Sequence, residues 1–431
     1  MLTLLLWTAL LAAAAEEAKP AAPTADQVAR LVRDLDAREL TVRNEAERAL
    51  LELGEAVLPL LPRVGDDTPA EISLRVSRVQ QKLLEAQAAA AAEPTVVTLQ
   101  RDDAPISEVF AEIQKQTGNT IVDNRGAFNE TTTDVHVKVD FDKTPFWKAL
   151  DQTLDQAGMA LYQYSGERGA YVVSRPPGAG PAAEHAHYSG IFRIEPLRFE
   201  AVRDLRNRDT QSLRFYLEVT WEPRLQPFAI LQPLGEISAV GDNGENIAVT
   251  SEDAMPEATI RSGMSATELE IQLALPPRDT KSLRTLKGKF LALVPGPAED
   301  FRFSKPPIAA RNAPPRRLEQ RKAGATVAID RLRKNNSAWE VSLRVKFDSP
   351  STALESHRGW ILDNDVYFID PAGRRFAAGG FEQSRQAKDE VGINYFFDLE
   401  QSPDTLDFVY RTPITILEIP IEYELRDLPL P

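Results

Sequence analysis

At 431 residues the chain is longer than one hydrophobic core normally organises, so we expect several domains. A formal net charge of −14 argues against nucleic acid as a partner, because phosphate binding needs a strong basic field. The chain has no cysteine, which excludes disulfides, thiolate metal sites and cysteine nucleophiles, and only four histidines remain for acid–base chemistry.

The chain begins with an apolar run, Leu2 to Leu11, followed by small residues from Ala12 to Ala15. This pattern is typical of a signal peptide that is cleaved near Ala15. The run is shorter than the roughly 20 residues of a membrane-spanning helix, and no later stretch is long and apolar enough. We therefore expect residues 1–15 to direct export to the periplasm or cell envelope, and no integral membrane segment in the mature chain.

Residues 24–87 show the apolar spacing of short amphipathic helices, with Gly54 ending the second of them. The segment AERALLELGEAVLPLLPRV within this region resembles a HEAT-type helical repeat, with a plain helical bundle as the alternative. An alanine-rich segment, residues 86–93, follows and ends at Pro94. We interpret that segment as a tether.

The clearest pattern is an internal repeat within residues 94–176, whose two halves align without a gap at an offset of 40 residues. Pro105 matches Pro145 at the start of each predicted helix, and Gly118 matches Gly158 directly after its end. Each half therefore predicts a strand, a helix and a second strand. We expect a duplicated βαβ module, in which two helices cover one face of a small sheet. These four residues are its structural markers.

This half-repeat resembles the short N-terminal domain of secretins and TonB-dependent proteins, in which a short turn with proline precedes a leucine-rich helix that ends at glycine. The residues that carry the resemblance are Asp103, Ala104, Pro105 and Gly118 in the first half, and Lys143, Thr144, Pro145 and Gly158 in the second. It covers about 80 of the 431 residues. The resemblance implies a periplasmic protein-binding or docking module. No secretin pore or TonB barrel sequence follows it.

After a linker at residues 177–190, the apolar period changes to two, as in Phe215, Leu217 and Val219. Short alternating segments separated by turn signals predict two C-terminal β-sandwich domains of immunoglobulin-like type, residues 191–306 and 325–431. A basic, proline-rich linker, residues 307–324, separates them. The two regions share an order of strand and turn patterns, so we interpret them as a duplication of one sandwich. The whole chain is thus predicted to be a multi-domain α+β protein.

Few residues are placed as metal ligands or catalysts. His185 and His187 have ligand spacing but lie in the linker, and we interpret Asp363-Asn364-Asp365 as a solvated loop rather than a calcium site. Paired carboxylates occur without a partner motif, and neither a P-loop nor a Gly-x-Ser-x-Gly motif is present. We therefore predict no catalytic residues, no cofactor and no metal.

Other marked residues also have a structural interpretation. Trp221, Trp339 and Trp360 are expected to anchor cores, and the basic stretch from Arg311 to Lys322 is expected to be a solvated hinge. The alternative for the basic stretch is docking on an acidic partner or surface.

The sequence therefore predicts a non-catalytic interaction or scaffold protein of the envelope, whose partners are envelope proteins and not nucleic acid. We expect the module at 94–176 to bind them, through an edge strand that pairs with a partner strand. Two alternatives remain: an accessory component of a secretin or TonB-type system, and a carbohydrate-binding protein or an enzyme whose site the sequence hides.

Overall fold

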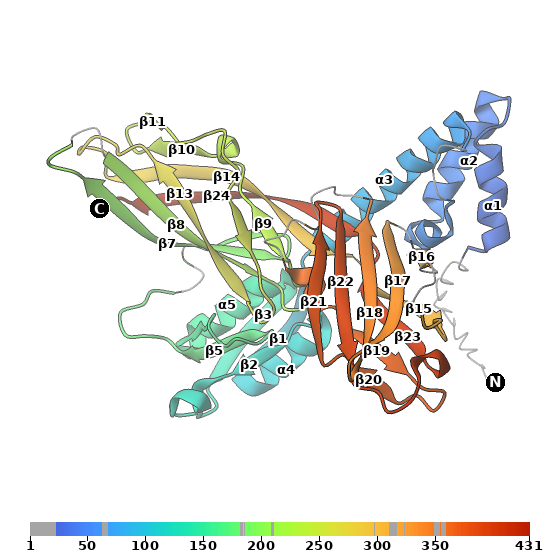
Figure 1. Cartoon of the computed structure of the whole chain (residues 1–431). Coiled ribbons are helices and arrows are strands. Elements are labelled where there is room, and N and C mark those ends of the chain that lie inside the picture. The colour runs from blue at the N-terminus through green and yellow to red at the C-terminus, as the bar shows by residue number, and fades with distance from the viewer. Residues whose placement is uncertain are drawn as a thin grey trace, which may run out of the picture. The chain divides into compact units, whose positions relative to one another are not determined.

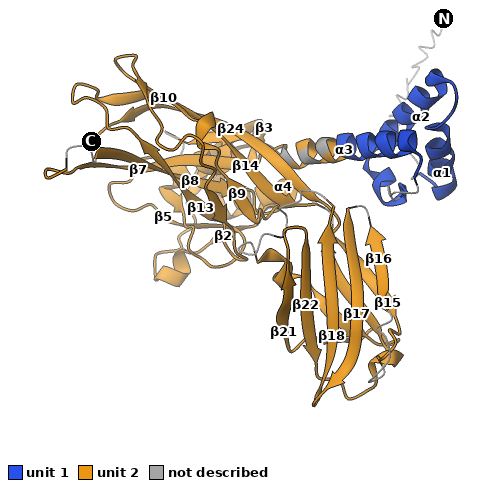
Figure 2. Ribbon diagram, turned by 45° about the horizontal axis from the view of Figure 1, so that its top comes forward, with its two compact units in different colours: residues 1–83 blue, residues 84–431 orange. Residues whose placement is uncertain are grey.

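The structure is a computed structural model that describes residues 23–62, 68–181, 184, 186–207, 211–296, 298–309, 317–322, 324–348, 354 and 359–431. The chain divides into two compact units, residues 1–83 and 84–431 (Figure 2). The first unit is helical, and the second is rich in strands (Figure 1). The mixed, strand-rich class is therefore confirmed. The predicted signal peptide lies outside the described residues.

The first unit consists of short helices whose apolar faces meet. They are α1 (Ala25–Asp34), α2 (Leu40–Glu52), the 3-10 helix η1 (Glu55–Leu60) and the first part of α3 (Ala70–Ala92). The Thr24 side chain accepts a hydrogen bond from the Gln27 backbone N–H and so caps α1. Val28, Leu50 and Val76 are fully buried, so the predicted apolar period does form this core.

The alanine-rich segment differs from its predicted role. Instead of a tether, its residues continue α3 as far as Ala92. Alanine has the highest helix propensity of all residues, so a run of alanines extends an existing helix at little cost. A helix-breaking residue such as proline or glycine ends such a helix, and Pro94 is the first one after the alanine run.

Residues 94–176, which we call the repeat module, contain β1 (Val96–Pro105), α4 (Ile106–Thr117), β2 (Ile121–Asp123), η2 (Arg125–Phe128), β3 (His136–Pro145), α5 (Phe146–Ala157), β4 (Met159–Leu161) and β5 (Ala170–Ser174). Strands β1 and β3 pair antiparallel, and Gln100 lies opposite Asp140, its own equivalent 40 residues later. The ladder is symmetric about this pair: Leu99 opposes Phe141 and Arg101 opposes Val139. The sequence repeat therefore folds as two copies related by an approximate two-fold axis.

The module contains two sheets rather than the one expected. The first strands of the two halves pair with each other, whereas the second strands, β2 and β4, both flank β5 in a three-stranded sheet. Strand β5 lies outside the alignable repeat. A strand pattern shows which face is buried, but it does not choose a neighbour.

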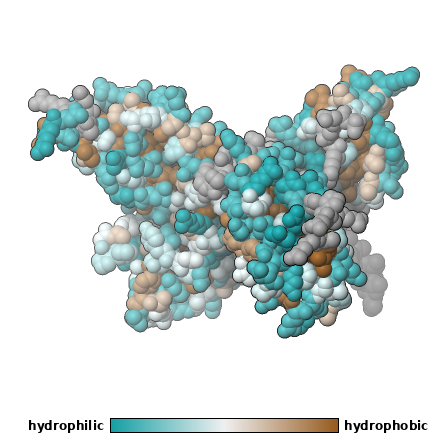
Figure 3. Space-filling model, viewed as in Figure 1, coloured by the Kyte–Doolittle hydropathy of each residue, from teal (hydrophilic) through white to brown (hydrophobic). Residues whose placement is uncertain are grey.

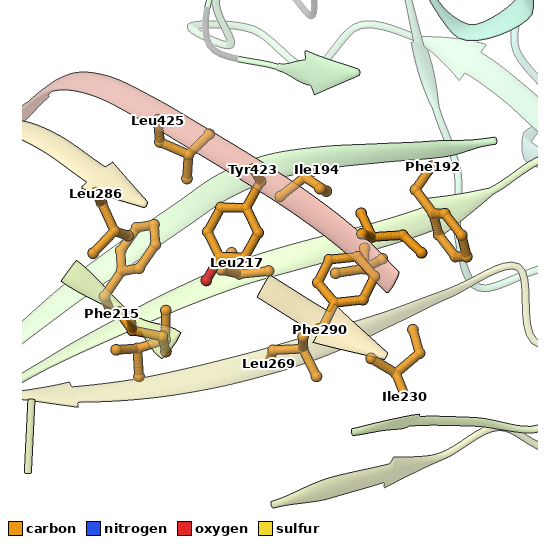
Figure 4. Packing of buried hydrophobic residues seen from close by; sticks show 14 of the residues in the cluster. Phe192, Ile194, Phe215, Leu217, Ile230, Leu269, Leu286, Phe290, Tyr423 and Leu425 are labelled. Atoms are coloured by element: carbon orange, nitrogen blue, oxygen red, sulfur yellow. The ribbon is translucent and has the colours of Figure 1, made fainter. Parts of the chain in front are cut away.

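The first sandwich consists of two sheets that pack face to face. One sheet holds β6 (His187–Ser189), β7 (Phe192–Arg203), β8 (Gln211–Trp221) and β13 (Ala266–Leu273). The other holds β9 (Ala229–Leu231), β10 (Ser238–Gly241), β11 (Asn246–Ile247), β12 (Glu257–Thr259), β14 (Ser282–Pro295) and β24 (Ile416–Pro429), and η3 (Leu234–Glu236) lies in the connection after β9. Figure 4 shows Phe215 and Leu217 of one sheet packed with Phe290 and Tyr423 of the other.

The second sandwich also pairs two sheets. One holds β15 (Ala298–Ser304), β23 (Asp407–Pro413), β19 (Val366–Ile369) and β20 (Arg375–Ala377). The other holds β16 (Leu318–Lys322), β17 (Ala325–Asn335), β18 (Ala338–Phe347), β22 (Glu390–Phe397) and β21 (Gly380–Gln386); η4 (Trp360–Asp363) and η5 (Pro403–Thr405) lie in connections. Strand β16 falls within the predicted basic linker, and β6 falls within the predicted linker at 177–190. Both short strands complete sheet edges that the sequence pattern did not reveal.

The two sandwiches share one strand order, and the strand that follows each of them in the chain pairs with a sheet of the other sandwich. The order β13-β8-β7-β6 corresponds to β22-β18-β17-β16, and β11-β10-β14 corresponds to β20-β19-β23. Yet β15, which follows β14 in the chain, pairs with β23, whereas β24, which follows β23, pairs with β14 (Figure 1). The shared order agrees with the predicted duplication. The predicted boundaries, however, place both strands with the wrong sandwich.

The β14–β24 ladder is long and tightly packed. It runs from the Ser282–Pro429 pair to the Pro295–Ile416 pair. Gly288 lies opposite Tyr423, and a Cβ at Gly288 would collide with the tyrosine ring. Ile419, Ile421, Tyr423 and Leu425 are all buried. The strictly alternating apolar residues of β24 therefore belong to the core of the first sandwich.

Hydrophilic residues cover most of the face seen in Figure 3, with hydrophobic residues in small groups. In the part of the chain that the structure describes, no helix is long and apolar enough to cross a membrane.

Candidate interaction site

A buried ion pair joins α5 of the repeat module to β7 of the first sandwich. Arg193 Nε lies 2.7 Å from Asp151 Oδ2, and the two side chains are 2% and 0% exposed. The Tyr188 hydroxyl donates to the same oxygen at 2.7 Å. Burial and the Asp151 carboxylate raise the pKa of Tyr188, so this hydroxyl keeps its proton. One turn earlier on α5, Trp147 Nε1 donates to the Ile191 carbonyl at 3.0 Å. We call this group the Asp151 cluster.

A row of three glutamates crosses the neighbouring sheet. Glu218 of β8 lies opposite both Glu195 of β7 and Glu268 of β13. Glu195 is paired with Arg193 at 2.6 Å and Glu268 with Arg198 at 2.8 Å, whereas Glu218 has no ion pair among the described residues. Burial, reinforced by the charge of Glu195, raises the pKa of Glu218 to about 7.

A second cluster joins the start of the module, at Thr95 just before β1, to the same sandwich. The Glu222 carboxylate accepts hydrogen bonds from the Thr95 backbone N–H at 2.8 Å, from Asn119 Nδ2 at 3.1 Å and from Arg224 Nε at 2.6 Å. The Asn119 side-chain oxygen Oδ1 in turn accepts a hydrogen bond from the Arg224 backbone N–H at 3.0 Å. The Glu222 side chain is fully buried. We call this group the Glu222 cluster.

Both clusters have the composition of structural interfaces. A catalytic acid or base must reach its substrate, but Asp151 and Glu222 are fully buried and already hold cationic and neutral donors. Breaking one partner of a buried pair leaves an uncompensated charge, so such pairs fix a geometry strongly. We conclude that the two clusters hold the repeat module in one position on the first sandwich.

A concave surface of mixed chemistry lies where the β4–β5 loop meets the two sandwiches. We call it the junction pocket; its volume is about 350 Å³. Its apolar wall includes Trp360, whose ring stacks on Phe228 with centroids 4.9 Å apart. Arg168 and Arg261 also line it, and neither forms an ion pair within the described chain. Such a pocket suits a ligand with both apolar and charged groups.

A second cavity, about 270 Å³, lies on the outer face of the repeat module between β1 and α4. Its walls are Leu99 and Arg101 of β1 together with Glu108, Ala111, Glu112 and Lys115 of α4. We call it the α4 groove. It mixes carboxylates and cations on a floor that includes the buried Leu99.

The four predicted marker residues occupy equivalent positions. Pro105 and Pro145 precede α4 and α5 with φ values of −57° and −54°. Gly118 and Gly158 directly follow these helices in the left-handed region, with φ values of 71° and 64°. The predicted helix starts and stops are therefore present in both halves. They shape the module and do not form a binding site.

The weaker candidates for metal binding do not come together. Asn364 donates to the hydroxyls of Tyr410 and Thr412 at 2.9 Å, so it is engaged in the second sandwich. His187 lies in β6, and His185 lies outside the described residues. No group of three or more histidines, aspartates or glutamates among the described residues could hold a metal ion.

The remaining marked residues are structural. Trp221 is buried in the first core, and Trp339 and Trp360 pack against the second. Within the basic stretch, Arg317 pairs with Glu319 at 2.6 Å and Lys322 with Glu299 at 2.8 Å, whereas residues 311–316 lie outside the described chain. The described part is therefore an ion-paired strand edge and not a free hinge.

Sequence reasoning missed the residues of both clusters. Arg193 lies in β7 between the buried residues Phe192 and Ile194, and Glu222 directly follows the mostly apolar strand β8, as in FYLEVTWE. A charged residue inside an apolar strand is a signal of a buried partner, because an unpaired buried charge is costly. That signal indicates an interface but does not say which distant segment supplies the partner.

Comparison with protein-family models, with curated proteins and with solved structures finds no match to this chain.

Proposed function

We propose that this chain is a non-catalytic interaction protein of the cell envelope that presents protein-binding surfaces on a rigid body. The observation that carries the proposal is the Asp151 cluster, which holds the repeat module on the first sandwich through the fully buried Asp151–Arg193 pair. Rigid placement lowers the ordering cost of binding, so it suits a protein whose task is to display a surface.

The exchanged strands support the same proposal. Because β15 pairs with β23 and β24 pairs with β14, neither sandwich can move away without breaking a ladder. The module, which resembles the short N-terminal domain of secretins and TonB-dependent proteins, is then held on a double sandwich of immunoglobulin-like type. We propose that the helices of the first unit form a HEAT-like repeat. An accessory role in a secretin or TonB-type system is the more specific form of this function.

An exposed aromatic group favours a second candidate, carbohydrate binding. Phe128 and Tyr162 lie 5.1 Å apart, and Tyr162 and Tyr164 lie 5.9 Å apart, measured between ring centroids. Tyr164 is 82% exposed and Phe128 46% exposed. Exposed aromatic rings stack on sugar rings as well as on protein side chains.

The test uses the chain from Glu16 onward as bait for envelope extract of the source cell. We expect the same protein partner in repeated captures, no capture by heat-unfolded bait, and no turnover of glycosides, esters, phosphates or peptides. Cell fractionation should recover an exported chain that starts near Glu16. Turnover that Glu218→Gln abolishes would overturn the proposal, and saturable binding of oligosaccharides without any protein partner would favour the second candidate.

A further inference from the structure

The junction pocket is lined by charged side chains that have no ion-pair partner within the described chain. Arg168 comes from the β4–β5 loop and Arg261 from the turn between β12 and β13. Asp363 and Asp365 come from the end of η4 and the residues before β19. All four residues are exposed. A ligand that enters the pocket therefore meets two free cations and two free anions.

The two arginines lie on the same side of the pocket. Gly166 of the β4–β5 loop approaches Gly263 so closely that a Cβ at Gly263 would collide with the Gly166 carbonyl oxygen. Arg168 follows Gly166 by two residues, and Arg261 precedes Gly263 by two. The contact between the repeat module and the first sandwich thus brings two guanidinium groups together. A guanidinium group binds a carboxylate through two parallel hydrogen bonds, so this wall suits a carboxylate.

The two aspartates belong to the wall that the second sandwich supplies. Asn364, which lies between them, has an extended backbone, and its side chain donates two hydrogen bonds into the second sandwich. Successive side chains of an extended chain point to opposite sides, so Asp363 and Asp365 point away from that core and toward the pocket. Arg411 also lines the pocket, but it is paired with Asp300 at 3.0 Å. Within the described chain, no ion pair joins the aspartates to the arginines across the pocket.

An apolar surface completes the pocket. The rings of Phe228 and Trp360 stack there, and Ile260, which is buried, lines the same cavity. The volume of about 350 Å³ is near the lower end of the roughly 300–1,000 Å³ that ligand pockets occupy. The pocket therefore suits a small ligand that carries an apolar group together with separate positive and negative charges.

We propose that the junction pocket binds a short peptide with free ends, about two or three residues long. The carboxylate of the peptide meets Arg168 and Arg261, and its amino group meets the two aspartates. An apolar side chain of the peptide lies against Trp360.

The arrangement of charges favours this class of ligand over others. A ligand of one sign would bring a like charge toward one of the two walls, whereas a zwitterion is attracted by both. A free amino acid holds both charges on one carbon, but a peptide separates them by roughly 3.5 Å for each residue. Two charged walls that are not joined by an ion pair therefore suit a peptide. This inference goes beyond the proposed function and does not depend on it.

Isothermal titration calorimetry of the full chain with the dipeptide Ala-Phe tests the proposal. We expect saturable binding by the wild-type chain. The N-acetylated and the C-amidated dipeptide each lack one charge, and each should bind about tenfold more weakly or less.

Paired variants identify which wall meets which end of the peptide. The double variant Arg168→Gln, Arg261→Gln should no longer distinguish the free from the amidated dipeptide, although N-acetylation should still weaken its binding. The double variant Asp363→Asn, Asp365→Asn should show the reverse. Matched controls remove an exposed charge outside the pocket, Arg206→Gln and Asp404→Asn, and should bind like the wild type.

Three results would overturn the proposal. The first is no saturable binding by the wild-type chain at millimolar dipeptide, and the second is equal binding of the free, acetylated and amidated forms. The third is tighter binding of phosphoethanolamine, which would assign the pocket to a lipid headgroup. The proposed function fails in a different way, because capture of no envelope partner would refute it while binding of the dipeptide could remain intact.

Discussion

Glu218 makes the stability of the second unit depend on pH, and Glu218→Gln should remove that dependence. The native pKa of this carboxyl is about 7, and its ordinary value is 4.5. Between these two values the folded chain keeps the proton that the unfolded chain has lost. Folded protein therefore binds more protons than unfolded protein, and the free energy of unfolding falls as the pH rises from about 4.5 to 7.

The size of this effect follows from the two pKa values. Each pH unit between them corresponds to about 1.4 kcal/mol, so the complete loss is about 3 kcal/mol, with about 2–3 kcal/mol of it between pH 5 and 8. Glutamine has nearly the same shape as protonated glutamate and carries no charge at any of these pH values. The variant should therefore match the wild type near pH 4.5 and exceed its stability by about 2–3 kcal/mol at pH 8.

Urea unfolding at pH 5, 6, 7 and 8, followed by tryptophan fluorescence, measures this difference. Trp147 lies in the Asp151 cluster and Trp221 in the adjoining core, so both rings report on this region. The matched control Glu270→Gln changes an exposed glutamate of β13 and should leave the wild-type pH dependence in place. If Glu218→Gln shifts stability equally at pH 5 and pH 8, the argument from burial and like charge is refuted.

Three further predictions concern the elements that fix the fold. Arg193→Ala should lower the free energy of unfolding of the second unit in urea by about 3–5 kcal/mol, because Asp151 is left buried and unpaired. Adding Asp151→Leu should recover part of this loss, and a double variant no more stable than the single one would contradict the reasoning. Gly118→Val and Gly158→Val should each lower stability by about 1–3 kcal/mol, through backbone strain alone, and a loss below about 0.3 kcal/mol in both would contradict it. Removing residues 416–431 should unfold the first sandwich, although the sequence pattern assigned β24 to the second sandwich. Amide hydrogen exchange in β14 measures this, and an unchanged protection of β14 would show that pairing with β24 is not required.

Local signals in the sequence predict the two helices of the repeat module and the strands on either side of each helix. Pro105 and Gly118, with their equivalents, act through the conformations that single residues allow, so they mark helix ends without knowledge of the rest of the fold. Apolar periods of 3.6 and 2 likewise show which face of each helix or strand is buried. The alanine-rich segment was misread because composition alone did not separate a flexible tether from a continuing helix, and the short strands β6 and β16 were missed within predicted linkers.

The candidate site was far less accessible to such reasoning. Asp151 and Arg193 are 42 residues apart, and Asn119 and Glu222 are 103 apart. Charged residues among apolar strand residues indicate a buried partner, but only the fold shows which distant segment supplies it. The sequence also did not show that the α4 groove is exposed, because the two halves of the repeat look alike and do not indicate which helix a neighbouring strand will cover.

The sequence by itself determined the local elements, the repeat at 40 residues and the shared succession of strand and turn patterns in the two β-regions, because each depends on residues that are close in the chain. Only the tertiary structure decided which strands pair. Strand β24 has one apolar face and would fit beside β23 as readily as beside β14 by its pattern. Its place on β14 depends on complementary packing across more than 100 residues, such as the Tyr423 ring over Gly288. The alternation of apolar and polar residues specifies which face of a strand is buried. Only the fit between side chains of strands far apart in the sequence specifies which strand pairs with it.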